Sequence, residues 1–329
     1  MTPDIAPTPR DVIFENGTAQ VYRFRNPEGK RQDRKPVLLV PSLINRWYVL
    51  DLRPGFSLVE TLVEHGFDTY CLDWGVANDE DRYLSWEDVL ARLRRAITAV
   101  KRTSGADDIG LLGYCMGGTL TAIHGALHPE DIASYVSLPA PIDFSEGGLL
   151  ADLVDERWFD AEAITEPGNL SPTQMQSGFV ALRPTGQISK WVMLADRADN
   201  EAFVEGFTAL ETWVNDNIPF PGEAYETYIS ELYQENRLVD GEHYVGGEPV
   251  DLSNIDYPLL TLAADRDNIC PPDAARPLNE MASSTRNQFE VISGGHIGAL
   301  VGSRGPRTLY PKIVDWFDDT LALAASAAA

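Results

Sequence analysis

A cysteine between two glycines is the residue of this chain best suited to nucleophilic chemistry. Residues 113–117 read Gly-Tyr-Cys-Met-Gly and follow directly on the apolar run 109–112. Where a strand turns sharply into a helix, glycine is needed two residues before and after the turn, because a side chain there would collide with neighbouring backbone. Such a turn, a nucleophile elbow, exposes its central side chain, which here is Cys115. A thiol in that position predicts acyl transfer through a thioester intermediate.

A nucleophilic thiol needs a base, and the base needs an acid that orients it. His296 lies in Gly-Gly-His-Ile-Gly, where the glycines allow a loop to carry the imidazole to the elbow. The acid is expected in residues 264–271, where Asp265 and Asp267 both qualify. Their spacing does not decide between them, but Asp267 is nearer the apex of the loop and is therefore the expected acid. The chain order of nucleophile, acid and histidine is that of α/β-hydrolase folds.

An acyl-transfer site also needs two backbone N–H groups that stabilise the oxyanion of the tetrahedral intermediate. Met116, at the start of the helix after the elbow, is expected to supply one of them. The second is expected from residues 41–45, the loop after the first parallel strand, with Ile44 as the candidate and Leu43 as the alternative.

The remaining histidines and cysteines have ordinary structural interpretations. His124 and His128 belong to the helix behind the elbow and are expected to cap or solvate it, and His243 lies in a polar, turn-like stretch. Cys71 is expected in a core strand, and Cys270 is expected to be a small apolar side chain beside the acid loop. Three scattered cysteines predict neither a disulfide framework nor a zinc site.

The elements that must position the site alternate between strands and helices. A hairpin is expected around Asn16-Gly17. Strands are expected at 37–40, 69–74, 108–114, 132–138, 258–264 and 289–292, and helices at 57–65, 85–101, 116–127, 273–283 and 308–323. This alternation predicts an α/β fold with a mostly parallel, doubly wound sheet. Residues 142–235 do not show this alternation of strands and helices. They are interpreted as a mostly helical cap, inserted into a core formed by 1–141 and 236–329.

The composition narrows the classes of partner. The chain has 329 residues and a formal charge of -24, with 50 acidic against 26 basic residues, which argues against nucleic acid and anionic membranes. The acidic, lysine-poor surface fits a salt-rich cytoplasm, although GC-biased codon usage would also deplete lysine. There is no apolar run of membrane-spanning length and no signal-peptide pattern at the N-terminus, so a cytoplasmic protein is expected.

Several segments resemble polyhydroxyalkanoate synthases, in the same order as in that family. They are residues 40–52 (VPSLINRWYVLDL), 73–75 (DWG), 113–118 (GYCMGG), 233–238 (YQENRL), 267–271 (DNICP) and 295–298 (GHIG). The similarity covers roughly residues 35–320. The length of the chain and the absence of a long N-terminal extension make it most similar to the short catalytic subunits of the two-component, class III type.

The resemblance implies an α/β-hydrolase fold and an acyltransferase that polymerises 3-hydroxyacyl-CoA, with short-chain 3-hydroxybutyryl-CoA as the expected substrate, into polyester with release of CoA. It implies Cys115, Asp267 and His296 as the triad, with His296 deprotonating the incoming hydroxyl. It also implies a second synthase subunit, a homodimer or both, and association with a polyester granule. CoA enters as part of the substrate, so no cofactor and no metal are expected. One departure concerns Asn268, which follows the acid where the family usually has histidine and leaves substrate preference open.

The phosphates of CoA require local cations on this acidic protein. Arg183 matches an arginine of the family's cap that is associated with substrate handling, and Arg46 is either a further cation or part of a surface ion pair. Asn45 is expected to anchor its loop or to contact pantetheine. The aromatic residues at helical spacing in the cap are expected to pack in its core rather than to line a tunnel; they are Trp191, Phe203, Phe207 and Trp213.

Two other functions stay open at this point. The first is a cysteine-dependent α/β hydrolase, such as a thioesterase or a dienelactone-hydrolase-like enzyme, although that class is typically shorter and lacks the large insertion. The second is a non-catalytic subunit that kept the fold as an interaction module, against which the intact set of Cys115, Asp267 and His296 argues.

Overall fold

A computed structural model describes residues 3–27, 29 and 33–323 of the chain. The described residues form an eight-stranded sheet in the order β1-β2-β6-β3-β7-β8-β11-β12. The first two strands make the expected antiparallel hairpin, and β2 also runs antiparallel to its other neighbour β6, whereas all neighbours from β6 to β12 are parallel. The strands are β1 (Arg10–Asn16), β2 (Ala19–Phe24), β3 (Val37–Val40), β6 (Thr69–Asp73), β7 (Ile109–Tyr114), β8 (Ile132–Leu138), β11 (Leu259–Ala264) and β12 (Asn287–Ile292). This confirms the mostly parallel α/β fold.

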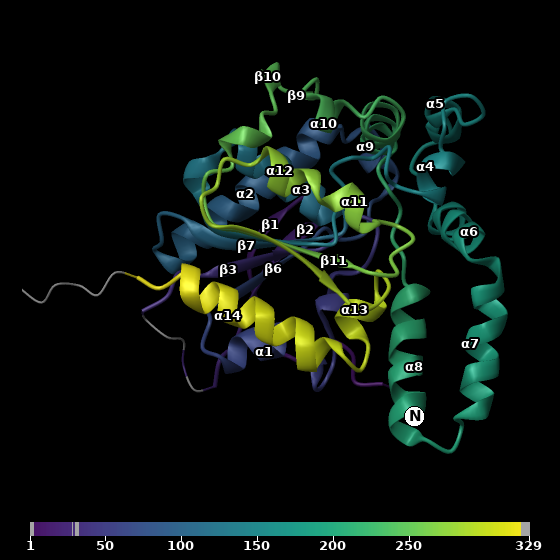
Figure 1. Ribbon diagram of the computed structural model, residues 1–329, viewed down its shortest axis with the longest axis horizontal. Coiled ribbons are helices and arrows are strands. Elements are labelled where there is room, and N and C mark those ends of the chain that lie inside the picture. The colour runs from purple at the N-terminus through teal and green to yellow at the C-terminus, as the bar shows by residue number, and fades with distance from the viewer. Residues whose placement is uncertain (1–2, 28, 30–32, 324–329) are drawn as a thin grey trace, which may run out of the picture.

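Helices cover both faces of the sheet, and each face has its own apolar core (Figure 1). On one face lie α2 (Trp86–Ser104), α3 (Met116–Leu127) and the short α12 (Pro277–Met281); on the other lie α1 (Leu58–Glu64) and α14 (Tyr310–Thr320). The long helix α2 begins where the sequence indicates, because Ser85 and Asp88 form a capping box, and it ends at Gly105 in the left-handed conformation. The strongly apolar strands β3 and β7 are buried between these layers.

Between β8 and β11 the described chain adds no strand to the main sheet and is largely helical. Figure 1 shows these helices stacked along one side of the molecule, with α7 and α8 as an antiparallel pair. They are α4 (Leu149–Leu153), α5 (Ala161–Thr165), α6 (Pro172–Leu182), α7 (Pro184–Asp196), α8 (Glu201–Val214) and α9 (Gly222–Thr227), followed by a π-helical segment, η4 (Tyr228–Gln234). None of the described helices has the length and apolar character needed to cross a membrane.

Two side chains at the end of this helical segment hold it to its own beginning. Asn236, at φ 51°, donates from Nδ2 to Asp143 Oδ1 at 2.9 Å, and its Oδ1 accepts from the Phe144 N–H at 2.8 Å. Gln234 Nε2 donates to two backbone carbonyls after α4, at 2.8 and 3.0 Å. The Tyr-Gln-Glu-Asn stretch therefore acts in the structure as a clasp between the two ends of the segment.

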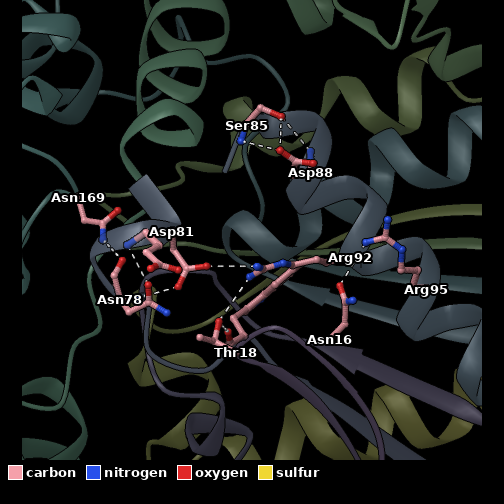
Figure 2. Close-up of polar contacts among 11 residues, drawn as sticks. Asn16, Thr18, Asn78, Asp81, Ser85, Asp88, Arg92, Arg95 and Asn169 are labelled. Carbon is pink, nitrogen blue, oxygen red and sulfur yellow. Dashed lines mark hydrogen bonds and ion pairs between the residues drawn. The ribbon is translucent and has the colours of Figure 1, made fainter. Parts of the chain in front are cut away.

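A polar network ties the hairpin, helix α2 and the helical segment together (Figure 2). Arg92 of α2 contacts Asp81 Oδ1 at 3.2 Å and Thr18 Oγ1 of the hairpin turn at 3.4 Å. Asn78, three residues before Asp81, offers its backbone carbonyl to Asn169 Nδ2 at 2.6 Å. The guanidinium of Arg92 thus connects the hairpin at the edge of the sheet to the loop that contacts the helical segment through Asn169.

The expected elements differ from the structure in a few places. The helix expected at 273–283 is split into α11 (Pro272–Ala275) and α12, because Pro277 has no N–H to continue the first helix. The last helix begins at Tyr310, after a π-helical turn, η6 (Gly305–Leu309). Short elements that the pattern did not predict are η1 (Trp47–Leu50), β4 (Asp51–Arg53), β5 (Phe56–Ser57), η2 (Asp79–Tyr83), η3 (Pro129–Asp131), α10 (Arg237–Asp240), β9 (Tyr244–Val245), β10 (Glu248–Pro249), η5 (Leu252–Asn254) and α13 (Gly298–Val301).

Candidate active site

Cys115 lies at the turn between β7 and α3, with φ 57° and ψ −133°. A non-glycine residue rarely adopts a positive φ, and such strain is typical of functional turns. The glycines on either side are sterically required. A Cβ on Gly113 would lie 2.2 Å from Thr121 Oγ1, and a Cβ on Gly117 would lie 2.2 Å from the Val40 carbonyl oxygen. The turn has the geometry that the Gly-Tyr-Cys-Met-Gly pattern predicts.

The loop after β11 brings a carboxylate to the histidine. Asp267 Oδ1 accepts from the backbone N–H groups of Ile269 and Cys270 at 2.8 and 2.9 Å, which fixes the side chain. Its Oδ2 lies 2.7 Å from His296 Nδ1, in a pair that is almost completely buried. Asp265 is directed elsewhere: it forms an exposed ion pair with its neighbour Arg266 and accepts from a backbone N–H of the histidine loop.

The other ring nitrogen of His296, Nε2, is buried and has no hydrogen-bond partner among the described residues. Burial alone would lower the pKa of His296, but the electrostatic influence of the neighbouring Cys115 and Asp267 side chains, together with the hydrogen bond to Asp267, raises it to about 10. The imidazole can therefore hold a proton close to the sulfur at neutral pH. A residue not anticipated from the sequence, Tyr114, packs its ring against the imidazole with centroids 5.5 Å apart.

Cys115 lies where two cavities meet. The smaller, of about 220 Å³, is lined mainly by apolar side chains, with His296, Asn45, Gln176 and Asn217 as its polar members. The larger, of about 450 Å³, lies under the helical segment and is mainly apolar; its lining includes Met116, Leu150, Val154, Phe159, Met175, Phe220, Tyr228 and Tyr233. Cys115 thus borders two mainly apolar cavities, of which the smaller also contains the imidazole of His296.

The residues expected to supply oxyanion donors lie at this junction. Ile44 lines both cavities together with Cys115, and Met116 lines the larger one. Leu43, the alternative to Ile44, lines a separate narrow gap beside Trp74. Of the two neighbours in the loop, Ile44 is therefore the one that borders the cavities at Cys115, and its role as an oxyanion donor stays a prediction.

The loop that carries Ile44 is bound to the helical segment by side-chain contacts. Asn45 Nδ2 donates to Asn217 Oδ1 at 2.5 Å, and Asn217 Nδ2 donates to Gln176 Oε1 at 2.8 Å. The side chain of Arg46 lies 3.5 Å from a carboxylate oxygen of Asp216, which is the ion-pair alternative for this residue. Asn45 therefore anchors its loop and also faces the cavity that contains His296.

Arg183 is not brought to the cysteine. It is exposed at the start of α7 and lines a third cavity, together with Arg266 and Arg304. Among the cap aromatics, Trp213 is buried and faces the smaller cavity at Cys115, whereas Trp191 is 55% exposed. The expectation that these aromatics pack in the core is therefore wrong for Trp191, whose ring contacts Phe207 but stays more than half exposed.

Two histidines are more buried than their sequence context indicates. His243, expected in a polar turn, is 1% exposed and lies 3.0 Å from Glu231, and burial lowers its pKa. His124, expected to cap or solvate its helix, is buried 3.3 Å from Asp131. The carboxylate partners come from distant or adjoining segments that no local pattern connects to the imidazoles.

The other two cysteines lie in apolar surroundings. Cys71 and Cys270 are fully buried, and burial raises the pKa of both thiols well above the usual range. Their predicted role as core side chains is confirmed. Cys115 is the cysteine of the three that is partly accessible.

Comparison with known proteins finds relatives over almost the whole chain. The alpha/beta hydrolase fold family matches residues 35–303, and the family described as "Poly-beta-hydroxybutyrate polymerase (PhaC) N-terminus" matches residues 1–62. Among curated proteins, the poly(3-hydroxyalkanoate) polymerase subunits PhaC of Haloarcula marismortui and Allochromatium vinosum are 33% and 31% identical to this chain. Each alignment covers 96% of the chain, and they cover 69% and 90% of those relatives. The subunit PhaC of Haloferax mediterranei is 36% identical over 95% of the chain, which spans 64% of that relative's length.

Solved structures share the fold at low sequence identity. The monoacylglycerol lipase of Paleococcus ferrophilus has a TM-score of 0.56 at 18% identity, covering 89% of this chain and 97% of the lipase. MGS-M2, an alpha/beta hydrolase enzyme from a deep-sea metagenome library of the Medee basin, has a TM-score of 0.56 at 14% identity, covering 95% and 99%. These similarities establish the α/β-hydrolase fold.

Proposed function

Because this chain belongs to the poly(3-hydroxyalkanoate) polymerase family, we propose that it polymerises 3-hydroxyacyl-CoA, with 3-hydroxybutyryl-CoA as substrate, through a thioester on Cys115. The observation that carries the proposal is the imidazole of His296. Its Nδ1 is held by Asp267 at 2.7 Å, and its Nε2 is unpartnered among the described residues and buried beside the cavity that Cys115 lines. A nucleophile, a base and an orienting acid are the parts that acyl transfer needs.

In the first half of the cycle, the Cys115 thiolate attacks the thioester carbonyl of 3-hydroxyacyl-CoA. The carbonyl oxygen becomes an oxyanion, for which the backbone N–H groups of Met116 and Ile44 are the proposed donors. The tetrahedral intermediate collapses with cleavage of the bond to the CoA sulfur. His296 gives its proton to that sulfur, so that free CoA leaves and an acyl-Cys115 thioester remains.

In the second half, neutral His296 removes the proton from the 3-hydroxyl group of an incoming 3-hydroxyacyl-CoA. The alkoxide attacks the acyl-Cys115 carbonyl, an ester bond forms, and the Cys115 thiolate leaves. Asp267 stabilises the imidazolium and fixes the tautomer in which Nε2 is the free base. Each cycle thus adds one ester bond and releases one CoA.

A cysteine suits this reaction better than a serine for an energetic reason. Acyl transfer between two thiols is nearly neutral in free energy, so the acyl group stays activated until an alcohol takes it. A serine ester would already have lost that activation. The mainly apolar cavity beside Cys115 supports the proposal, since it offers an acyl or polyester segment a place from which water is excluded.

The proposal includes the surroundings of the catalytic chain. Residues 142–235 are a cap on a core formed by 1–141 and 236–329. The word subunit in the relatives' names supports a second synthase subunit as partner, with a homodimer as an additional form. The protein works in the cytoplasm at the surface of its polyester product.

The test is incubation with 3-hydroxybutyryl-CoA, with release of free thiol followed over time and the acyl product identified. Insoluble polyester supports the proposal, whereas free 3-hydroxybutyrate in its place supports the cysteine hydrolase. Cys115→Ala should abolish thiol release. The matched control is Cys71→Ala, which also removes one sulfur but far from the site, in β6, and should retain activity.

A result without thiol release has to be separated from a missing partner. Mass spectrometry of the intact chain after a short incubation with substrate reports the first half-reaction, which needs no second hydroxyl-bearing substrate. A mass increase of one acyl group in the wild type, absent in Cys115→Ala, supports the thioester. Absence of both acylation and thiol release, repeated with the second subunit of a relative added, would refute the proposal.

A further inference from the structure

A third cavity, of about 490 Å³, lies next to the candidate active site and is lined by three arginines. Arg183 comes from the start of α7, Arg266 from the acid loop, and Arg304 from the segment after α13. The remaining lining consists of small or uncharged residues: Asn268, Ser293, Gly294, Gly295, Gly298, Gly302 and Ser303. We propose that this arginine pocket binds the phosphate groups of the CoA thioester substrate, with Arg266 and Arg304 as phosphate ligands in addition to Arg183.

The charge of the pocket is opposite to that of the protein. The chain carries 50 acidic and 26 basic residues, yet the described residues that line this cavity include three guanidinium groups and no carboxylate. Arg304 donates to Ser293 Oγ at 2.8 Å, and neither Arg304 nor Arg183 has a carboxylate partner among the described residues. Arg266 lies 3.3 Å from Asp265, but both side chains are exposed and this pair is weakly held.

The arginine pocket and the smaller cavity at Cys115 are built from the same three segments. The end of α6 places Val180 in the cavity at Cys115, and Arg183 follows three residues later in the arginine pocket. The acid loop contributes Ile269 to the former and Asn268 to the latter. The histidine loop contributes His296 to the cavity at Cys115 and Gly295 to the arginine pocket. The two spaces are therefore separated only by the width of these loops.

This arrangement matches the chemical layout of a CoA thioester. The reacting sulfur must lie at Cys115, the pantetheine arm is uncharged and rich in amides, and the phosphates are at the far end. The cavity at Cys115 offers uncharged hydrogen-bonding side chains, from Asn45, Gln176 and Asn217, and the arginine pocket offers planar guanidinium groups that bind phosphate through paired N–H donors. At Gly298 the wall of the pocket faces open space, because no heavy atom lies within 4 Å of a Cβ placed on that residue.

The inference rests on the proposed function for the identity of the ligand, and its test separates the two. The first measurement is KM for 3-hydroxybutyryl-CoA and for 3-hydroxybutyryl-pantetheine, which has the same reacting end but lacks the nucleotide and its phosphates. The variant is the double substitution Arg266→Gln and Arg304→Gln. From the energy of exposed, charge-assisted hydrogen bonds, we expect KM for the CoA substrate to rise about 10-fold. KM for the pantetheine substrate should stay within about 2-fold, because that substrate never reaches the pocket.

Two further variants make the result specific. Arg307→Gln removes an exposed positive charge three residues from Arg304 but outside the lining of the pocket, and it should leave both KM values unchanged. The double substitution of Arg266 and Arg304 by lysine keeps the charges and should recover most of the affinity for the CoA substrate. Equal KM values for the CoA substrate in wild type and the glutamine variant would overturn the inference, as would an equal rise in KM for both substrates.

Binding measurements keep the inference testable even if the chain does not polymerise the substrate. Calorimetry with free CoA and with pantetheine needs no turnover. Tighter binding of CoA than of pantetheine in the wild type, lost in the glutamine variant, supports the arginine pocket whatever the reaction. Failure of the wild type to bind CoA, or binding that the glutamine variant retains, overturns it, while absence of thiol release alone bears on the proposed function.

Discussion

Asp267→Asn should abolish most of the activity while leaving the fold in place. The wild-type carboxylate accepts three hydrogen bonds: two from backbone N–H groups at 2.8 and 2.9 Å, and one from His296 Nδ1 at 2.7 Å. The amide oxygen of asparagine can keep the two backbone contacts, but its NH₂ group then faces Nδ1. Nδ1 must become an acceptor, so the proton moves to Nε2 and the nitrogen facing Cys115 is no longer a free base.

The size of the effect follows from what is lost. A buried charge-assisted hydrogen bond is worth about 1.5–3 kcal/mol, which alone corresponds to a loss of roughly 10- to 150-fold in rate. Inversion of the tautomer brings the expected loss in kcat to about 10²–10⁴-fold. The assay is release of CoA from 3-hydroxybutyryl-CoA, with circular dichroism as the check that the fold is retained.

Asp265→Asn is the matched control, since Asp265 is two residues away and was the competing candidate. Its carboxylate is partly exposed and pairs with Arg266, and asparagine can still accept from the backbone N–H of Gly294. We expect a loss of less than about 3-fold, in line with the small energy of exposed ion pairs. The reasoning is refuted if Asp267→Asn keeps more than a tenth of wild-type activity, or if the control loses as much as Asp267→Asn does.

Three further predictions concern the elbow, the pH dependence of stability and the clasp. Gly117→Ala should lower the free energy of unfolding, measured by urea denaturation, by about 1–3 kcal/mol, because its Cβ would lie 2.2 Å from a backbone carbonyl oxygen. The control Gly186→Ala, whose Cβ meets only a side-chain atom at 3.6 Å, should be neutral or stabilising. Equal losses of stability in the two variants would contradict the steric argument. The pKa of His296 in the folded state, about 10, lies above the ordinary 6.5, so the folded state binds this proton more tightly than the unfolded state does. This proton therefore adds its full contribution to the free energy of unfolding below pH 6.5, and the contribution is lost as the pH rises towards 10. The difference in unfolding free energy between wild type and His296→Gln should therefore narrow across that window, and a constant difference would exclude this linkage. Asn236→Ala should lower the free energy of unfolding by about 1–3 kcal/mol and speed proteolysis of residues 144–235. Asn236→Gly, whose backbone is compatible with φ 51°, should recover only part of that stability. Full recovery would mean that the side-chain hydrogen bonds of Asn236 contribute nothing.

Those parts of the fold that depend on local rules could be predicted from the sequence. The hairpin follows from Asn16-Gly17, and α2 follows from the capping box of Ser85 and Asp88. The elbow follows from the steric need for glycine beside Cys115. In each case neighbouring residues decide the backbone conformation, so a pattern of a few residues contains the answer.

Features that depend on distant contacts could not be predicted. Nothing near His243 indicates that Glu231 will bury it, and nothing near Tyr114 indicates that its ring will support an imidazole 182 residues away. The choice between Asp265 and Asp267 also needed either the family resemblance or the structure. Two carboxylates in one loop look alike until the position of the histidine is known.

The clasp at Asn236 has a consequence for how the chain can be re-engineered. Because one side chain hydrogen-bonds to residues 143 and 144, the start and finish of the long helical excursion are already next to each other on the body of the molecule. The segment thus leaves and re-enters the body of the molecule at neighbouring points, between two strands that are themselves paired. Segments from relatives could therefore be grafted between these two anchor points, if they also cover the apolar residues against which Phe220, Tyr228 and Leu232 pack.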